Sequence, residues 1–233
     1  MDRDISICLT SCGRFTELER TIVSLVKYWD GPPPAAFYIH EDSGQQPKDL
    51  ILRMDKLLLE HWNIMAEWTF STYAGQVHGI DTTYQQVTTP YIFHCQDDWE
   101  FFKTGFIAAS RSVLEHDHRI HTVWLRNPDD RNGHPVIHTK YKTTDGFRYQ
   151  IPVLNHKRVW HGMTWNPGLR RLKDYKEIGR FGSFCNWNKG HHISSEMQYN
   201  MRYHLAGFFG ATLLYGYVKH IGWHNSTKKL QSK

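Results

Sequence analysis

Two adjacent carboxylates, Asp97 and Asp98, follow a buried-looking run at residues 91–95. Neighbouring carboxylates repel each other, so a strand end that carries both needs a cation or hydrogen-bond donors. Hard divalent ions such as Mg²⁺ and Mn²⁺ prefer carboxylate oxygens and usually share their coordination sphere with substrate phosphates. A solvated loop after a strand is the alternative interpretation, but the flanking apolar residues favour a functional site.

The elements that position this pair are predicted by the apolar pattern. Short apolar runs at residues 5–10, 37–40, 68–70 and 91–95 indicate strands, and helical spacing between them indicates intervening helices. This alternation predicts an α/β fold with a mostly parallel sheet and right-handed crossovers. Ligands bind beyond the carboxyl ends of such strands, where Asp42 and the Asp97-Asp98 pair both fall.

The second half of the sequence has a less regular pattern. Residues 136–153 predict a hairpin around Asp145-Gly146, and residues 159–165 predict another strand. Residues 168–172 suggest a short helix, Glu196 opens a longer one, and residues 213–220 predict a final strand. No repeat or low-complexity linker divides the chain, so we expect a single domain over residues 1–233.

Composition restricts the class of protein. The 233 residues are 40% hydrophobic and 22% charged, which suits one large α/β domain. The net charge is +5, but no compact basic stripe with interleaved aromatics is present, so we expect no nucleic-acid partner. We expect a cytoplasmic protein with reduced cysteines, because a leader and a membrane-spanning run are both missing. Its basic tail, residues 228–233, permits at most peripheral membrane contact.

Three segments carry a resemblance to a known family. Residues 5–11, the strand ending in Glu41-Asp42-Ser43-Gly44, and residues 91–99 occur in the order and approximate spacing of GT-A glycosyltransferases. The chain resembles the family-2-like branch over about its first 105 residues. The resemblance implies a GT-A type fold, a mostly parallel central sheet flanked by helices, with a smaller mixed C-terminal acceptor region. Residues 1–105 would bind the nucleotide sugar and residues 106–233 the acceptor.

The resemblance also implies a role for the acidic residues of the first half. Asp42 would contact the nucleoside, and Gln96-Asp97-Asp98 maps onto the DXD-type motif, whose last residue, Asp98, would ligate Mn²⁺ or Mg²⁺. Gln96 stands where the family usually has an acid and brings no charge, so affinity for metal is expected to be weaker. Thr10 and Gln76, together with His78, would line the nucleoside pocket by position.

Glu196 is the candidate general base. The resemblance implies an acid at the start of a late helix, and a carboxylate there can take the proton of an acceptor hydroxyl. The family often shows a pair of acids where this chain has Glu196-Met197, so only Glu196 is carried over; Asp174 and Glu177 are weaker substitutes. A favourable partner for the helix dipole is the alternative reading of Glu196.

Basic and aromatic residues complete the expected site. His220, or less favourably His224, would supply a second metal ligand, although sixteen histidines make any single one weak evidence. Arg14 and Arg171, with Arg170 as a further candidate, would stabilise the leaving diphosphate; a solvated helix face explains Arg170 and Arg171 equally well. Sugar-stacking aromatics of the acceptor half are expected among Trp160, Trp165, Trp187 and Trp223.

The expected activity is that of a hexosyl-type glycosyltransferase. It would transfer a sugar from a nucleoside-diphosphate sugar, with UDP or GDP as the expected nucleotide, to a hydroxyl of a glycan or glycoconjugate, with metal dependence and inversion. Two alternatives stay open. A sugar nucleotidyltransferase would bring a glycine-rich basic loop after the first strand, which residues 11–14 are too short to form. A non-catalytic glycan- or nucleotide-binding module is favoured by Gln96 and Met197.

Overall fold

A nine-stranded sheet lies at the centre of the computed structural model, which describes residues 3–130, 138–153, 160–185 and 194–222. The strand order is β3-β2-β1-β4-β9-β6-β10-β8-β7, and β8 and β9 run against the other strands. The strands are β1 (Ile5–Ser11), β2 (Ala36–Glu41), β3 (Ala66–Phe70), β4 (Tyr91–Gln96), β6 (Ile120–Trp124), β7 (His138–Thr144), β8 (Phe147–Val153), β9 (Gly168–Arg171) and β10 (Phe209–Leu213). A separate ribbon pairs β5 (Trp99–Phe101) with β11 (Val218–His220).

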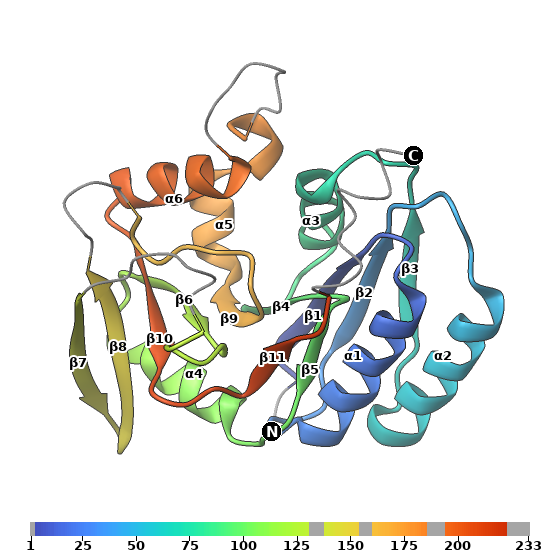
Figure 1. The fold of residues 1–233 in the computed structure, drawn as a ribbon, viewed down its shortest axis with the longest axis horizontal. Helices are drawn as coiled ribbons and strands as arrows, with labels where there is room; N and C mark the ends of the chain where they lie inside the picture. Colours follow the sequence, from blue (N-terminus) through green and yellow to red (C-terminus); the bar gives the residue numbers. More distant parts are fainter. Residues whose placement is uncertain (1–2, 131–137, 154–159, 186–193, 223–233) are drawn as a thin grey trace.

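Helices cover both faces of this sheet (Figure 1). They are α1 (Phe15–Tyr28), α2 (Lys48–Trp62), α3 (Gln76–Tyr84), α4 (Phe106–His116), α5 (Leu172–Ile178) and α6 (Ser195–Leu205), with a 3₁₀ turn, η1 (Phe181–Ser183). The first core contains side chains of α1, α2 and α4, and the second contains side chains of α3, α5 and α6. The mostly parallel α/β sheet expected from the sequence is therefore confirmed. None of the helices in the described parts of the chain has the length and apolarity that crossing a membrane requires.

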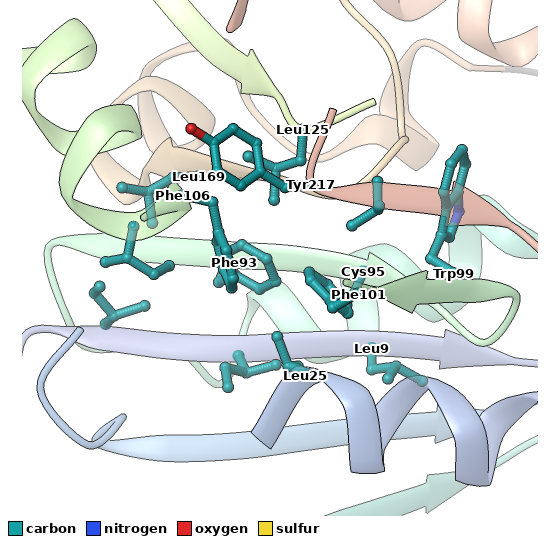
Figure 2. Close-up of a cluster of buried hydrophobic side chains, with 14 of the residues drawn as sticks. Leu9, Leu25, Phe93, Cys95, Trp99, Phe101, Phe106, Leu125, Leu169 and Tyr217 are labelled. Carbon is teal, nitrogen blue, oxygen red and sulfur yellow. The ribbon is translucent and has the colours of Figure 1, made fainter. Parts of the chain in front are cut away.

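The first core packs apolar strand residues against α1, α2 and α4. Alternate residues of β1, among them Ile7 and Leu9, are completely buried and face the apolar stripe of α1. Figure 2 shows Phe93 of β4 beside Phe101 and Phe106, and the centroids of the Phe93 and Phe106 rings lie 5.6 Å apart. Because β4 and β5 both pack into this core, the short turn between them, Asp97-Asp98, is held at both of its ends.

The second core is rich in aromatic residues with polar tips. Tyr199 and Tyr203 of α6 are fully buried, and the Tyr199 ring stacks on Trp165 with 5.6 Å between centroids. Asp81 of α3 accepts hydrogen bonds from the hydroxyl of Tyr175 and from the backbone N–H groups of Phe181 and Gly182, at 2.7, 3.0 and 2.7 Å. This buried carboxylate therefore ties α3, in the first half, to α5 and η1 in the second.

The structure corrects three predicted elements. Residues 168–171 form strand β9, not a helix, and all four are buried between β4 and β6. Gly168 fits there because an added Cβ would lie 2.3 Å from the carbonyl oxygen of Val123. Residues 160–165 contain no strand, and the run at 213–220 divides into the end of β10 and all of β11. The predicted hairpin is confirmed as β7 and β8 around Asp145-Gly146.

Candidate functional site

The carboxyl ends of three parallel strands lie side by side at one edge of the sheet. Ser11 at the end of β1 is in register with Glu41 of β2, and Thr10 is in register with Gln96 of β4. The turns that follow these strands therefore meet, as the sequence predicts. They bring together Asp42, the Asp97-Asp98 pair and Arg14, the residue that precedes α1.

Asp97 is completely buried and surrounded by donors from the turn after β1. Its Oδ2 accepts from the Ser11 hydroxyl at 3.1 Å, the backbone N–H of Cys12 at 3.2 Å and the Arg14 Nε at 3.1 Å. Its Oδ1 accepts from Arg14 Nη2. Burial raises the pKa of Asp97 above its usual range, and the adjacent Arg14 guanidinium opposes that rise. Asp97 thus acts as the anchor of the turn and of Arg14.

Asp98 has one oxygen engaged and one oxygen open. Its Oδ2 accepts from Arg14 Nη1 at 2.5 Å and lies 3.0 Å from His220 Nε2. Its Oδ1 is buried and accepts no hydrogen bond within the described residues. Burial works against ionisation of Asp98, but the hydrogen bonds from His220 and Arg14 outweigh it and lower the pKa. One oxygen of the Asp98 carboxylate is therefore engaged by Arg14 and His220, and the other has no donor among the described residues.

The β5–β11 ribbon positions His220 over Asp98. His220 is in register with Trp99, and their ring centroids lie 5.0 Å apart. The backbone N–H of Ile221 donates to the carbonyl of Asp98 at 2.8 Å. An added Cβ on Gly222 would lie 2.6 Å from Asp98 Oδ2 and 2.8 Å from Arg14 Nη1, so only glycine allows the chain to pass so close. Residues 221 and 222 therefore pass directly beside the Arg14–Asp98 pair.

Asp42 and Glu41 organise the neighbouring loops. Asp42 accepts from the Ser71 hydroxyl, and from the backbone N–H groups of Ala74 and Gly75 at 2.7 Å each. Glu41 Oε1 accepts from the N–H groups of Gly13 and Ser43, at 2.8 Å each. Glu41 was not predicted as a site residue, although it forms an acidic pair at a strand end just as Asp97-Asp98 does.

The other predicted nucleoside residues surround the same edge. Thr10 is buried, and its carbonyl accepts the N–H of Asp97 at 3.1 Å. Gln76 is exposed as the first residue of α3, and the Gln96 side-chain oxygen accepts from Trp99 Nε1 at 3.2 Å. Ser11 and Cys12, which hold Asp97, were not predicted; their only sequence signal is their place directly after the first strand.

Glu196 lies in the first turn of α6, where the sequence predicts it. Its Oε1 accepts from the Thr164 hydroxyl and from the backbone N–H of Trp165, the latter at 3.1 Å. Within the described residues, no hydrogen bond reaches Oε2. Glu196 is half-buried, and the two donors from residues 164 and 165 hold its Oε1. In Figure 1, α6 lies towards the same end of the molecule as α3.

Arg170 and Arg171 do not lie with Arg14 at the carboxyl ends of β1, β2 and β4. Arg171 is in register with Tyr91, at the amino end of β4, and donates to Asp174 and to the backbone carbonyls of Leu114, His118 and Ile120. The prediction that Arg171 binds the nucleotide sugar is therefore wrong. Strand β9 runs antiparallel to β4, so its last residue, Arg171, lies at the opposite edge of the sheet from Asp98. Arg170 is fully buried and donates to the hydroxyl of Tyr84 at 2.6 Å and to the carbonyl of Thr164 at 2.5 Å.

The remaining candidates are settled by burial or lie outside the described residues. Asp174 is buried against Arg171, and Trp165 is a core residue, so neither is open to an acceptor. Trp160 is half-buried against Trp124, with 4.8 Å between ring centroids. His224, Trp187 and Trp223 lie outside the described residues. No group of three or more His, Cys, Asp or Glu side chains that could hold a metal ion occurs in the described part of the chain.

Solved structures share this architecture. No family model matches the sequence, and no curated protein does either. TarS of S. aureus matches with a TM-score of 0.64 at 10% identity over 92% of this chain. The mannosyltransferase PcManGT from Pyrobaculum calidifontis, in complex with GDP-Man and Mn²⁺, matches with a TM-score of 0.63 at 9% identity over 91%. The chain has the GT-A fold.

A third glycosyltransferase supports the same fold. GalNAc-T7, in complex with UDP, GalNAc and Mn²⁺, matches with a TM-score of 0.62 at 10% identity over 93% of this chain. The chain spans 36% of the TarS chain, 55% of the PcManGT chain and 43% of the GalNAc-T7 chain. Each of these solved chains is therefore longer than the part that this chain matches.

Proposed function

We propose that this protein is a glycosyltransferase that moves a sugar from a nucleoside-diphosphate sugar to an acceptor hydroxyl. The observation that carries the proposal is the cluster of Arg14, Asp97, Asp98 and His220 at the carboxyl edge of a GT-A sheet. Proteins of this fold have been solved with UDP-GlcNAc and with GDP-Man, which supports UDP or GDP as the nucleotide here. A diphosphate needs positive charge at its site, and Arg14 supplies it.

The site also fits a divalent ion. Asp98 Oδ1 is a buried carboxylate oxygen that no described donor satisfies, and such an oxygen suits Mn²⁺ or Mg²⁺. We propose that Asp98 holds the ion with His220 beside it, and that the bound ion would neutralise charge on the leaving diphosphate. Two of the solved structures of this fold contain Mn²⁺.

The proposed reaction is a single displacement at the anomeric carbon. Glu196 takes the proton of the acceptor hydroxyl while that oxygen forms a bond to the anomeric carbon. The bond from this carbon to the diphosphate breaks, and the diphosphate leaves with the bonding electron pair. Arg14 offsets the charge that grows on it. Attack opposite the leaving group inverts the anomeric carbon, so a product with retained configuration, detected by NMR, would contradict the base role of Glu196.

A donor screen tests the activity. Thermal stability and donor hydrolysis are measured with UDP-, GDP-, dTDP- and CMP-sugars, each with and without Mn²⁺. We expect one donor to stabilise the wild-type protein and to be slowly hydrolysed, and Asp98→Ala to lose this hydrolysis. Asp49→Ala, which removes an exposed carboxylate from the first turn of α2, is the matched control and should behave as wild type.

The same screen separates the alternatives. A non-catalytic module would bind a nucleotide or glycan without hydrolysing any donor, and Met197 beside the single acid Glu196 supports that alternative. A sugar nucleotidyltransferase would release pyrophosphate from a nucleoside triphosphate and a sugar phosphate. If no donor of the panel binds, the glycosyltransferase proposal fails for these nucleotides.

A further inference from the structure

Arg14 occupies the position between the two acidic side chains. Its Nε and Nη2 donate to Asp97, and its Nη1 donates to Asp98 at 2.5 Å. The guanidinium is thus bidentate on Asp97 and bridges to Asp98, which is the planar geometry that distinguishes arginine from lysine. Each of its terminal nitrogens carries a second N–H, so the group still has donors for a further anion.

Arg14 balances part of the acidic charge at this edge. Asp97 and Asp98 would repel a diphosphate if nothing neutralised them. Arg14 contacts both, and His220 lies 3.0 Å from Asp98. Gln96 adds no charge, although it precedes the pair in the same motif. The Arg14 side chain is 14% exposed, so it is shielded from water yet can still be reached by a ligand.

We infer that Arg14 is a resident cation of the diphosphate site. It neutralises the acidic pair when no divalent ion is bound, and it competes with such an ion for that pair. The nucleoside diphosphate therefore binds to this protein without metal. This inference rests on the proposed function, because its ligand is the product of that reaction.

The competition is tested first with metal alone. Binding of Mn²⁺ to the protein without nucleotide is measured by electron paramagnetic resonance, for wild type and for Arg14→Gln. Removing the guanidinium leaves Asp97 and Asp98 uncompensated, so we expect Arg14→Gln to bind Mn²⁺ about tenfold more tightly or better. A merely structural role for Arg14 predicts the opposite, since a loosened site would bind Mn²⁺ less well.

The nucleotide arm uses calorimetry with UDP and with GDP, in EDTA and in Mn²⁺. Wild type should bind one of them in EDTA with an affinity within about tenfold of that in Mn²⁺. Arg14→Gln should lose at least about tenfold in EDTA and recover in Mn²⁺. Arg14→Lys, which keeps the charge without the fork, should lie between the two.

Arg20→Gln is the matched control. Arg20 lies on α1, is exposed, and pairs with Glu100 at 3.1 Å, so its loss should change neither Mn²⁺ nor nucleotide affinity. Circular dichroism checks that each variant folds. If Arg14→Gln does not fold, the wild-type comparison of EDTA with Mn²⁺ still decides the inference.

Two results would overturn the inference while leaving the proposed function intact. One is wild-type nucleotide binding that disappears in EDTA, and the other is an Mn²⁺ affinity that Arg14→Gln does not increase. Failure of both nucleotides to bind under either condition would instead count against the proposed function, and the Mn²⁺ titration would then still decide whether Arg14 competes with metal.

Discussion

A single substitution of Glu196 can distinguish its proposed role as the base from binding of the nucleotide. Its two hydrogen bonds are both accepted by Oε1, so Glu196→Gln keeps one acceptor oxygen but loses the base. We expect kcat to fall by about 10²- to 10⁴-fold while nucleotide affinity stays unchanged. The measurements are steady-state transfer with the donor found in the screen, and calorimetry with its nucleotide.

A matched variant tests the other carboxylate that the sequence suggested. Glu177 is exposed on α5, so Glu177→Gln should retain wild-type kcat. If instead Glu177→Gln lowers kcat and Glu196→Gln does not, the base has been assigned to the wrong helix.

Thr164 orients this carboxylate through its hydroxyl. Thr164→Val removes the donor to Glu196 Oε1 and leaves only the backbone N–H of Trp165. We expect kcat to fall by about tenfold with an unchanged KM for the donor, because the base is less well positioned but the donor site is untouched. Thr212→Val, whose hydroxyl bonds to the neighbouring carbonyl of Leu213, is the control. Equal kcat values for both variants would show that Thr164 does not orient Glu196.

At the residue scale, the sequence was informative where chemistry depends on a strand end. Asp98, Asp42 and Arg14 lie in the turns that follow β4, β2 and β1, so the parallel sheet places them at the same edge. Arg171 is an arginine like Arg14, but its strand, β9, runs antiparallel to β4, and no local sequence pattern shows this direction. The hydrogen bonds from Arg14 to Asp97 and Asp98 depend on side-chain geometry, and no sequence pattern indicates them.

At the scale of elements, Asp81 joins the two halves of the molecule. The Asp81 carboxylate accepts hydrogen bonds from Tyr175, Phe181 and Gly182. In Asp81→Asn, the side-chain N–H₂ group would face some of these donors and could not accept from them. We expect a loss of about 1–3 kcal/mol in the free energy of unfolding, measured by urea denaturation. Glu67→Gln, at an exposed position on β3, should change it by less than about 0.5 kcal/mol. Equal effects would mean that the α3–η1 contact is not a structural joint.

Strands and helices of the first half could be predicted because their apolar periods are clear. β9 could not, because Gly168-Leu169-Arg170-Arg171 shows no alternation and places two guanidiniums inside the sheet. Their burial is tolerated only because Arg170 and Arg171 find carbonyls and hydroxyls from distant segments. These acceptors come from segments far away in the sequence, so the residue types of the four-residue segment alone cannot predict that it forms a buried strand.

At the scale of the whole molecule, buried histidines predict acid sensitivity. Burial lowers the pKa of His121 from 6.5 to about 4, against the opposing pull of Asp174, and burial lowers the pKa of His94 well below its usual value. The unfolded chain binds these protons near pH 6.5, whereas the folded protein does not. The contribution of these two neutral histidines to the free energy of unfolding is therefore fully present above pH 6.5 and is lost as the pH falls towards 4.

His121→Phe tests this expectation. The His121 ring packs 4.2 Å from the Tyr203 ring, so a phenyl group suits the site. Between pH 7 and pH 5 the variant should lose less stability than wild type, by on the order of 1–2 kcal/mol in urea unfolding. Parallel losses in both proteins would show that His121 does not contribute to the acid sensitivity.

The place of β9 has a consequence for how the protein is made. A chain that emerges from the ribosome amino end first completes β1 to β4 long before residues 168–171 exist. Until then, β4 is an open edge whose backbone N–H and C=O groups can pair with another chain. Nascent or truncated forms that stop before β9 are therefore exposed to aggregation, and His220, which comes still later in the sequence, can reach Asp98 only after β9 has been made.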